Sequence, residues 1–293
     1  MQNSPKIVFS PPAFSQGRIN LPPGMVTFPN AKINIGLFVT ERRSDGYHQL
    51  ESVFYPVGWQ DVLEAVPAET VQFRRTGLPI PGEAATNLCL KAYELLRTDY
   101  ALPPVYLHLH KVVPIGAGLG GGSADGAFTL RLLNDEFALG LSDDALEVYA
   151  RQLGSDCAFF IRNVPRYCFG KGDEFAPVSL SLAGKWIVLV NPGIHISTAE
   201  AYAGVRPQSA PVALPDAVQQ PIAAWRDVIT NDFERHLVPR YPLIAALKER
   251  LYAAGAAYAA MTGSGSTVYG IFEQERNLDT EFSDFRYWQG YLT

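Results

Sequence analysis

The feature that most restricts the fold of this chain is a glycine-rich segment near its middle, Val113 to Phe128, which reads VPIGAGLGGGSADGAF. Six of its sixteen residues are glycine, whereas a simple turn needs one or two. Glycine lets the backbone approach a ligand closely, so that several N–H groups point at one anion. We expect a helix from Ser123 to about Ala138, with Asp125 in its first turn, and a helix start adds unpaired N–H groups. The segment therefore predicts a loop that binds a polyphosphate.

Two other interpretations of this segment make demands that its neighbours do not meet. Gly116, Gly118 and Gly121 match the dinucleotide fingerprint G-x-G-x-x-G, which requires a buried parallel strand before the loop. The preceding VYLHLHKVV instead alternates apolar and polar residues, as is typical of a half-exposed antiparallel strand. A Walker loop would need G-K-[ST] after the glycines, and this chain has none there. A dinucleotide-dependent oxidoreductase is thus the weaker alternative.

The patterns around the loop predict a mixed α+β protein with two lobes. From Lys32 to Val39 the odd-numbered apolar residues should lie on one face of a strand, with Lys32 and Asn34 on the other. The Asp-Gly pair at 45–46 indicates a turn. Further strands are expected at 61–66, 71–75, 105–113, 186–190, 256–261 and 267–272. Helices are expected at 86–98 with Thr86 as cap, after Ser142 to 153 with Gly154 as stop, near Thr198 and Tyr241, and at 243–254.

Length and composition restrict the class of protein further. The 293 residues suggest an N-terminal domain at 25–162 and a C-terminal domain at 163–293, after a Pro-rich and loosely ordered leader at 1–24. A net charge of -5 without a basic run argues against a nucleic-acid partner, and no apolar run is long enough for a membrane helix. The three cysteines form no C-x-x-C pair, which indicates a reducing, cytoplasmic location. The choice between monomer and homodimer stays open.

Four segments resemble the GHMP kinases, the superfamily of galactokinase, homoserine kinase, mevalonate kinase and phosphomevalonate kinase. PIGAGLGGGS at 114–123 is similar to the P-x-x-x-G-L-G-G-G-S signature, LGSDCAFFI at 153–161 to a G-S-D-V-P-F-F segment, and MTGSGSTVYGIF at 261–272 to a third motif. The segment at 30–54 contains R-S-D-G-Y-H at 43–48, which resembles the members that phosphorylate 4-diphosphocytidyl-2-C-methyl-D-erythritol. The glycine motifs identify the superfamily, and R-S-D-G-Y-H indicates the acceptor.

The resemblance implies an N-terminal lobe like ribosomal protein S5 and a C-terminal, ferredoxin-like α+β sandwich. It implies transfer of the γ-phosphate of ATP to the 2-hydroxyl of the cytidylyl compound, in the non-mevalonate route to isoprenoid precursors. Mg²⁺ would arrive as the counter-ion of ATP, since no cluster of metal ligands stands out in the sequence. The partner is then a small molecule.

The resemblance also assigns site residues. It makes Asp156 the base that accepts the proton of the hydroxyl, and Lys32 the cation beside it. ATP would contact Asn87, Lys111, Pro114, Ile115, Gly116, Ala117, Gly118, Leu119, Gly120, Gly121, Gly122 and Ser123. The acceptor would contact Asn34, Tyr47, His48, Thr198, Tyr202, Gly263, Ser264 and Gly265, with Tyr47 and His48 reading the cytosine.

Each assignment has an ordinary structural alternative. From the residues alone, Asp156 is better explained as a helix cap, and Lys32 and Lys111 as surface lysines, and the resemblance reverses this for Asp156 and Lys32. Tyr47 and His48 are residue types that are often exposed, and the glycines at 263 and 265 suit a hairpin turn. Homoserine or mevalonate kinase activity is disfavoured by R-S-D-G-Y-H, and a non-catalytic nucleotide-binding role by the presence of both Lys32 and Asp156.

The segments depart from the superfamily pattern in two places. Ser123-Ala124-Asp125-Gly126 stands where Ser-Ser-Asn-Ala is common, and a glycine early in a helix costs up to about 1 kcal/mol. Cys157-Ala158 replaces Val-Pro, which keeps the carboxylate of Asp156 but puts the backbone after it in doubt.

Overall fold

The computed structural model describes residues 25–293, and the leader expected at 1–24 lies outside the described residues. The strands are β1 Met25–Thr27, β2 Asn30–Arg42, β3 His48–Gln60, β4 Val62–Pro67, β5 Gln72–Gly77, β6 Val105–Lys111, β7 Arg166–Phe169, β8 Glu174–Pro177, β9 Trp186–Asn191, β10 Tyr258–Met261, β11 Val268–Phe272 and β12 Arg286–Tyr291. The α-helices are α1 Leu88–Asp99, α2 Gly121–Glu136, α3 Asp143–Leu153, α4 Cys157–Arg162, α5 Thr198–Ala203, α6 Leu214–Ala217, α7 Glu234–Arg240 and α8 Pro242–Ala253. Short 3-10 helices lie at Ala84–Thr86 and Ile222–Asp227.

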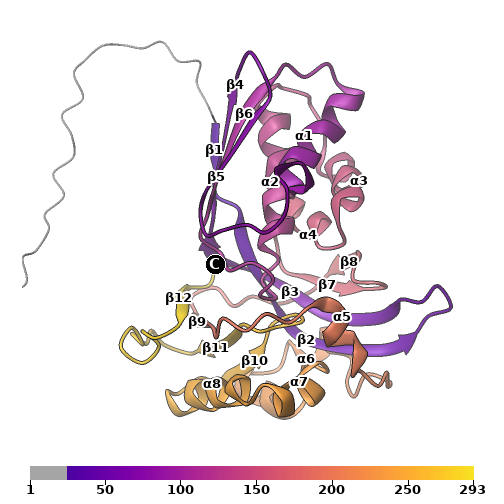
Figure 1. Ribbon diagram of the computed structural model, residues 1–293. Coiled ribbons are helices and arrows are strands. Elements are labelled where there is room, and N and C mark those ends of the chain that lie inside the picture. Colours follow the sequence, from indigo (N-terminus) through magenta and orange to yellow (C-terminus); the bar gives the residue numbers. More distant parts are fainter. Residues whose placement is uncertain (1–24) are drawn as a thin grey trace, which may run out of the picture.

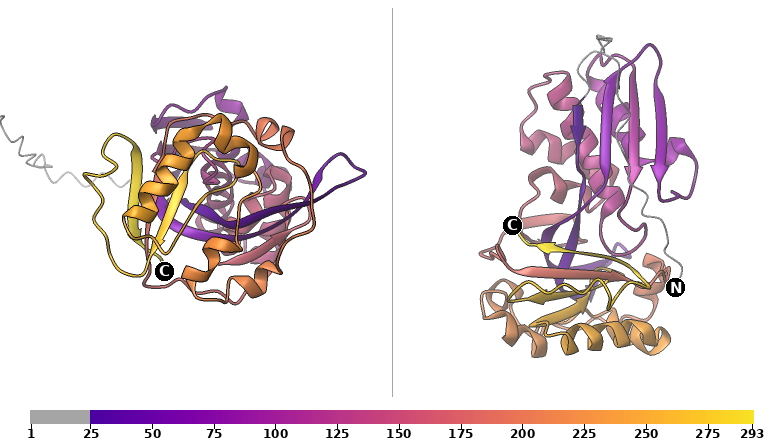
Figure 2. Two further views of the ribbon diagram at one scale, coloured as in Figure 1. Left: turned by 90° about the horizontal axis from the view of Figure 1, so that it is seen from below. Right: turned by 90° about the vertical axis from the view of Figure 1, so that its left-hand side faces the viewer.

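The strands form three four-stranded sheets, with the orders β1-β4-β6-β5, β2-β3-β7-β8 and β10-β11-β9-β12. Helices α1 to α4 cover one face of the first sheet, and α7 and α8 lie on the outer side of the third (Figure 1). The long strands β2 and β3 cross the middle of the molecule between these layers (Figures 1 and 2). The α+β class is confirmed. The predicted domain boundary at 162/163 stays a prediction. Strands β7 and β8, which follow it in the sequence, belong to the second sheet together with β2 and β3, because β7 pairs with β3 and β8 pairs with β7.

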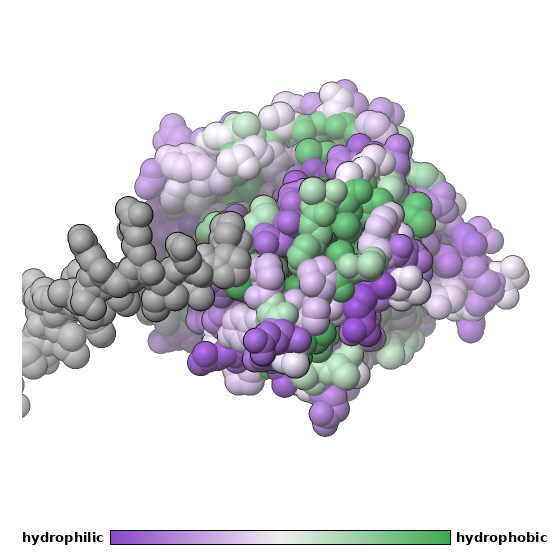
Figure 3. All heavy atoms as spheres, turned by 90° about the horizontal axis from the view of Figure 1, so that it is seen from above, coloured by the Kyte–Doolittle hydropathy of each residue, from purple (hydrophilic) through white to green (hydrophobic). Residues whose placement is uncertain are grey.

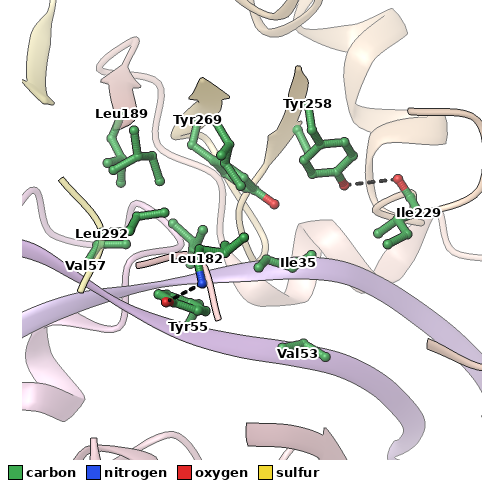
Figure 4. Close-up of a cluster of buried hydrophobic side chains, with 14 of the residues drawn as sticks. Ile35, Val53, Tyr55, Val57, Leu182, Leu189, Ile229, Tyr258, Tyr269 and Leu292 are labelled. Carbon is green, nitrogen blue, oxygen red and sulfur yellow. Dashed lines mark hydrogen bonds between the residues drawn. The ribbon is translucent and has the colours of Figure 1, made fainter. Parts of the chain in front are cut away.

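Three apolar cores hold the layers together. One fills the space between the first sheet and α1 to α4, and another lies under α7 and α8. The third joins β2 and β3 to β9, β10 and β11, with Ile35 of β2 and Tyr55 of β3 on the side of their sheet that meets Tyr269 of β11 (Figure 4). In this core the buried hydroxyl of Tyr258 donates to the carbonyl of Ile229 (3.0 Å), which satisfies a polar group that would be costly to leave unpaired.

The face pattern predicted for β2 is right at its start and wrong after Gly36. Ile33 and Ile35 lie in the core between the second and third sheets, whereas Leu37 and Val39 lie in the core beneath the third sheet. The pairing of β2 with β3 shifts register between Ile35 and Leu37, and Gly36 has φ +66°. A bulge of this kind inserts one residue and turns the following side chains to the opposite face.

The local signals for helix ends were mostly correct. The hydroxyl of Ser142 accepts from the N–H of Ala145, and Gly154 ends α3, as predicted. The prediction of Thr86 as the cap of α1 is wrong, because the side chain of Asn87 accepts from the N–H of Cys89 (2.9 Å). Asn87 starts the helix because its short amide reaches the second N–H.

Helix α2 begins two residues before the predicted start, at Gly121, so Asp125 lies beyond its first turn. Gly126, one of the departures from the superfamily pattern, lies where α2 meets α1, and an added Cβ would stand 3.0 Å from Cβ of Leu88. The glycine therefore allows close helix packing, which offsets its low helix propensity.

The surface and the three cysteines have features that are ordinary for a folded chain. Viewed from above, hydrophobic side chains form a band between hydrophilic margins, an ordinary mixture for a folded chain (Figure 3). Within residues 25–293, no helix has both the length and the apolar character needed to span a membrane. The three thiols of Cys89, Cys157 and Cys168 are free and buried.

Candidate active site

The glycine-rich loop connects β6 to α2 and has a backbone shape suited to an anion. Gly116, Gly118 and Gly120 have φ of +63°, +78° and +69°, and they alternate with Ala117 and Leu119, whose side chains are buried. Alternation of left-handed residues with others forms a concave row of N–H groups. Gly121, which completes the dinucleotide fingerprint, is the first residue of α2. The strand before the loop, β6, pairs antiparallel with β4 and parallel with β5, so the loop does not follow a strand of an all-parallel sheet and the fingerprint match is incidental.

The loop is held between the two halves of the chain. The N–H of Lys32 on β2 donates to the carbonyl of Leu119 (2.9 Å), and the hydroxyl of Thr262 donates to the carbonyl of Gly118 (3.0 Å). A Cβ on Gly118 would lie 2.0 Å from the Thr262 carbonyl oxygen, so only glycine fits this contact. The segment TGSGS is thus more than the hairpin turn that was its ordinary alternative, because it packs directly on the glycine loop.

A cavity of about 300 Å³ lies beside the loop and gathers most of the residues implied for catalysis and acceptor binding. Its lining includes Lys32, Asn34, Gly118, Gly120, Ser123, Asp156, Thr198, Tyr202, Gly263 and Ser264. Gly265 is not in this lining, and lies against Met261 and Ile196 instead. The tertiary structure therefore brings β2, α2, α4, α5 and the 262–266 loop to one place.

Lys32 and Asp156 form an ion pair in this cavity. Nζ of Lys32 lies 3.4 Å from Oδ2 of Asp156 and donates to Oδ1 of Asn34 (2.5 Å). Lys32 is only 4% exposed, so it is not a surface lysine, whereas Asp156 is 29% exposed and open to a ligand. Asp156 precedes α4, yet within the described part of the chain its side chain makes no capping hydrogen bond. Both ordinary alternatives for this pair are thus wrong.

The packing around Lys32 fixes its ammonium group. Nζ lies 4.4 Å from the ring centroid of Phe54, and a Cβ on Gly120 would come within 3.1 Å of the lysine stem. Asn34 in turn donates to the hydroxyl of Ser52 (2.9 Å). A lysine held in this way has lost its rotational freedom before any ligand binds, which lowers the entropic cost of positioning its ammonium group beside a ligand.

Lys111 belongs to a second buried cluster, on the other side of the loop, so the alternative of a surface lysine is wrong. Its Nζ lies 2.6 Å from Oδ2 of Asp61 and 2.6 Å from Oδ2 of Asp125. Oδ1 of Asp61 accepts from the N–H groups of Val112 and Val113, just before the loop. The cluster therefore ties β4, β6 and α2 together where the loop begins and ends.

Burial and charge act against each other in this cluster. Burial raises the pKa of Asp125 to about 7, although the charge of Lys111 opposes the shift. Burial also disfavours the charge on Lys111, but Asp125 and Asp61 outweigh it and raise the pKa of this lysine. Oδ1 of Asp125 has no hydrogen-bond partner among residues 25–293. Asp125 lines a cavity of about 170 Å³ together with Asn87, Leu88, Lys111, Ile115 and Gly122.

The remaining loop residues border a third cavity. Pro114, Ile115, Gly116 and Ala117 line a cleft of about 290 Å³, opposite His195. Every part of the segment from Pro114 to Ser123 therefore faces a cavity or is packed against a neighbour. Among the described residues, no group of three or more His, Cys, Asp or Glu side chains is arranged to hold a metal ion.

Tyr202 and Phe233 are in the lining of the catalytic cavity, whereas the predicted residues Tyr47 and His48 lie outside that lining. The ring of His48 stacks on that of Tyr202 (centroids 4.9 Å apart, 22° between planes), and Tyr202 packs edge-on against Phe233. Tyr47, which precedes His48 in the chain, is 60% exposed. Burial lowers the pKa of His48 and raises that of Tyr202 to about 12, so both rings are neutral near pH 7. Neutral stacked rings suit a flat base.

Sequence reasoning did not find Asp61, Phe233 or Lys171. Asp61 precedes β4 and belongs to no sequence motif, although it pairs with Lys111. Phe233 lies 199 positions after Asn34, although both residues line the catalytic cavity. Lys171 lies in the glycine-flanked turn between β7 and β8, and FGKGDE was a detectable turn signal.

Comparison with known proteins agrees with this geometry. Residues 87–163 match the family described as "GHMP kinases N terminal domain", and residues 213–286 match "GHMP kinases C terminal". The class is thus that of the GHMP small-molecule kinases. Solved homoserine kinase from Cytophaga hutchinsonii is similar at a TM-score of 0.66 over 90% of this chain and 95% of that one, but at 14% identity it shows the fold alone.

Proteins with higher sequence identity to this chain identify the family within this class. The chain is 55% identical over 249 residues to 4-diphosphocytidyl-2-C-methyl-D-erythritol kinase of Cytophaga hutchinsonii, covering 85% of this chain and 92% of the relative. It is 49% identical to the protein of the same name from Bacteroides thetaiotaomicron, over 87% and 94% of the two chains. A crystal structure of 4-(cytidine 5'-diphospho)-2C-methyl-D-erythritol kinase superposes at a TM-score of 0.78 with 29% identity, over 92% of this chain and 99% of that chain. The chain belongs to the family of 4-diphosphocytidyl-2-C-methyl-D-erythritol kinases.

Proposed function

We propose that this protein transfers the γ-phosphate of ATP to the 2-hydroxyl of 4-diphosphocytidyl-2-C-methyl-D-erythritol, in the non-mevalonate route to isoprenoid precursors. The observation that carries the proposal is the Lys32–Asp156 pair, 3.4 Å apart in a cavity bordered by the glycine loop. Names of relatives at 49–55% identity support the choice of acceptor. We include in the proposal a cytoplasmic location, which the free thiols support.

The chemistry follows from where the groups lie. Asp156 accepts the proton of the acceptor hydroxyl as its oxygen bonds to the γ-phosphorus, and the bond from that phosphorus to the β,γ-bridging oxygen breaks to release ADP. Lys32 stays hydrogen-bonded to Asn34, and its charge stabilises the oxygens around the phosphorus. The N–H groups of the loop and of the start of α2 hold the phosphates of ATP in line.

We place the adenosine of ATP in the cavity of Asn87, Lys111 and Asp125, on the far side of the loop from Asp156. Gly122 supports this placement, since a Cβ there meets nothing within 4 Å and the backbone is open to a phosphate. Mg²⁺ bound to ATP would neutralise phosphate charge, and the hydroxyl of Ser123, which lines the catalytic cavity, is the side chain we propose for contact with it.

We place the cytosine of the acceptor against the rings of Tyr47, His48 and Tyr202. An aromatic face stacks on a pyrimidine, and the imidazole nitrogens of neutral His48 can exchange hydrogen bonds with its edge. Asn34 and Thr198 line the cavity between this end and Asp156, and would contact the methylerythritol part.

The test is ATP consumption with the cytidylyl acceptor, with mevalonate and with homoserine, for the wild type and for Asp156→Ala. We expect turnover with the first acceptor and a loss of at least about a hundredfold in kcat in the variant. Folding of the variant is checked by circular dichroism and thermal unfolding. Equal turnover with mevalonate would refute the acceptor, and near-wild-type kcat in a folded Asp156→Ala would refute the base.

A further inference from the structure

We infer that Lys171, in the turn between β7 and β8, neutralises the diphosphate of the acceptor and makes the catalytic cavity selective for a nucleoside diphosphate ester. This inference rests on the proposed function, and it concerns a residue that no sequence motif pointed to. Lys171 and Gly172 line the same cavity as Lys32 and Asp156.

The charges in the cavity leave Lys171 available. Among the described residues, Lys32 and Lys171 are the only lysine or arginine side chains in the lining, and Asp156 is the only acid. Lys32 is matched by Asp156 at 3.4 Å. Among residues 25–293 the one acid paired with Lys171 is Asp173, whose Oδ2 lies 3.8 Å from its Nζ, and 40% of the lysine side chain is exposed. An acceptor that carries two phosphates needs a cation beyond the catalytic pair, and Lys171 supplies it.

The position of Lys171 is fixed between the two ends of the acceptor site. Its Nζ lies 5.1 Å from the ring centroid of Tyr47, at the end where we place the base. The turn that carries it is fastened to β3, because the N–H of Leu50 donates to the carbonyl of Gly170 (2.8 Å). In a cytidylyl ester the diphosphate lies between the base and the reacting alcohol, and Lys171 lies between Tyr47 and the catalytic cavity.

A lysine in this place contributes to recognition more than to the chemical step, because it lies at the diphosphate and not at the transferred phosphorus. It would discriminate against alcohols of similar size that carry no diphosphate. The contact is partly exposed, so added salt should weaken it.

The experiment compares Lys171→Ala and Lys171→Arg with Lys185→Ala by steady-state kinetics. Lys185 is the matched control, since it is a partly exposed lysine paired with one acid, Glu273, and is not in the lining of the catalytic cavity. We expect Lys171→Ala to raise KM for the cytidylyl acceptor by about five- to tenfold, in line with loss of one charge-assisted contact. The kcat and the KM for ATP should change less than threefold, and Lys171→Arg should keep most of the affinity.

A second measurement separates recognition of the diphosphate from a structural effect on the turn. CDP and cytidine are used as inhibitors competing with the acceptor, and Lys171→Ala should weaken inhibition by CDP severalfold while leaving that by cytidine unchanged. Equal weakening of both inhibitors, or an acceptor KM within twofold of the wild type, would overturn the inference. Failure of the wild type to use the cytidylyl acceptor would instead refute the proposed function.

Discussion

Gly118 offers the sharpest test of how the loop is built, through the substitution Gly118→Ala. A Cβ at this position would lie 2.0 Å from the carbonyl oxygen of Thr262, and φ is +78°. An L-residue in the left-handed region costs roughly 1–2 kcal/mol. The backbone of Thr262 cannot move aside as a flexible side chain would, so the two loops must separate and lose the hydrogen bond from the Thr262 hydroxyl, worth about 1 kcal/mol. The total is about 2–3 kcal/mol of unfolding free energy.

The assay is urea and thermal unfolding of Gly118→Ala beside Gly122→Ala, a control glycine of the same glycine-rich segment. A Cβ at Gly122 meets nothing within 4 Å, and this residue lies in α2. We expect Gly118→Ala to lower Tm by on the order of 5 °C. Gly122→Ala should be as stable as the wild type, but should raise the KM for ATP, because its methyl group lies where we place a phosphate. Equal stability of the two variants would refute the reasoning.

Two further predictions concern titration and base recognition. Because the pKa of Asp125 in the folded protein, about 7, exceeds its ordinary value of 3.8, its contribution to stability is complete below pH 4 and is lost as the pH rises to 7. The unfolding free energy of the wild type relative to Asp125→Asn should therefore fall by about 2 kcal/mol between pH 5 and pH 7, measured by urea unfolding; a pH-independent difference would contradict this. His48→Ala should raise the KM for the cytidylyl acceptor severalfold and leave that for ATP unchanged, because His48 stacks on Tyr202 away from the ATP cavity; the reverse order in the kinetics would rule out its role at the base.

Features governed by neighbours in the sequence were predictable. The glycine content indicated an anion-binding loop, Ser142 and Gly154 marked the ends of α3, and the alternation in β6 argued against a dinucleotide fold. Such signals depend on backbone freedom and on hydrogen bonds over a few residues, which the chain fixes locally. The resemblance of four segments then identified the superfamily and, through R-S-D-G-Y-H, the acceptor.

Features that depend on contacts between distant residues were decided only by the tertiary structure. The bulge at Gly36 sends Leu37 to another core. A glycine inside a strand pattern is a signal for a bulge, but which core receives the following side chains depends on the packing of the third sheet. Lys111 looked like a surface lysine because its partner Asp61 is 50 positions away.

The loop itself shows the same division. The six glycines of the segment 113–128 predicted a close approach of some group to the backbone, but not that the neighbour of Gly118 is Thr262, 144 positions away. Likewise, the turn at Lys171 was visible in the sequence, but its place at the acceptor cavity was not. Glycine and turn signals determine what the backbone can do, whereas burial and charge pairing depend on which segments meet, and only packing of the whole chain decides that.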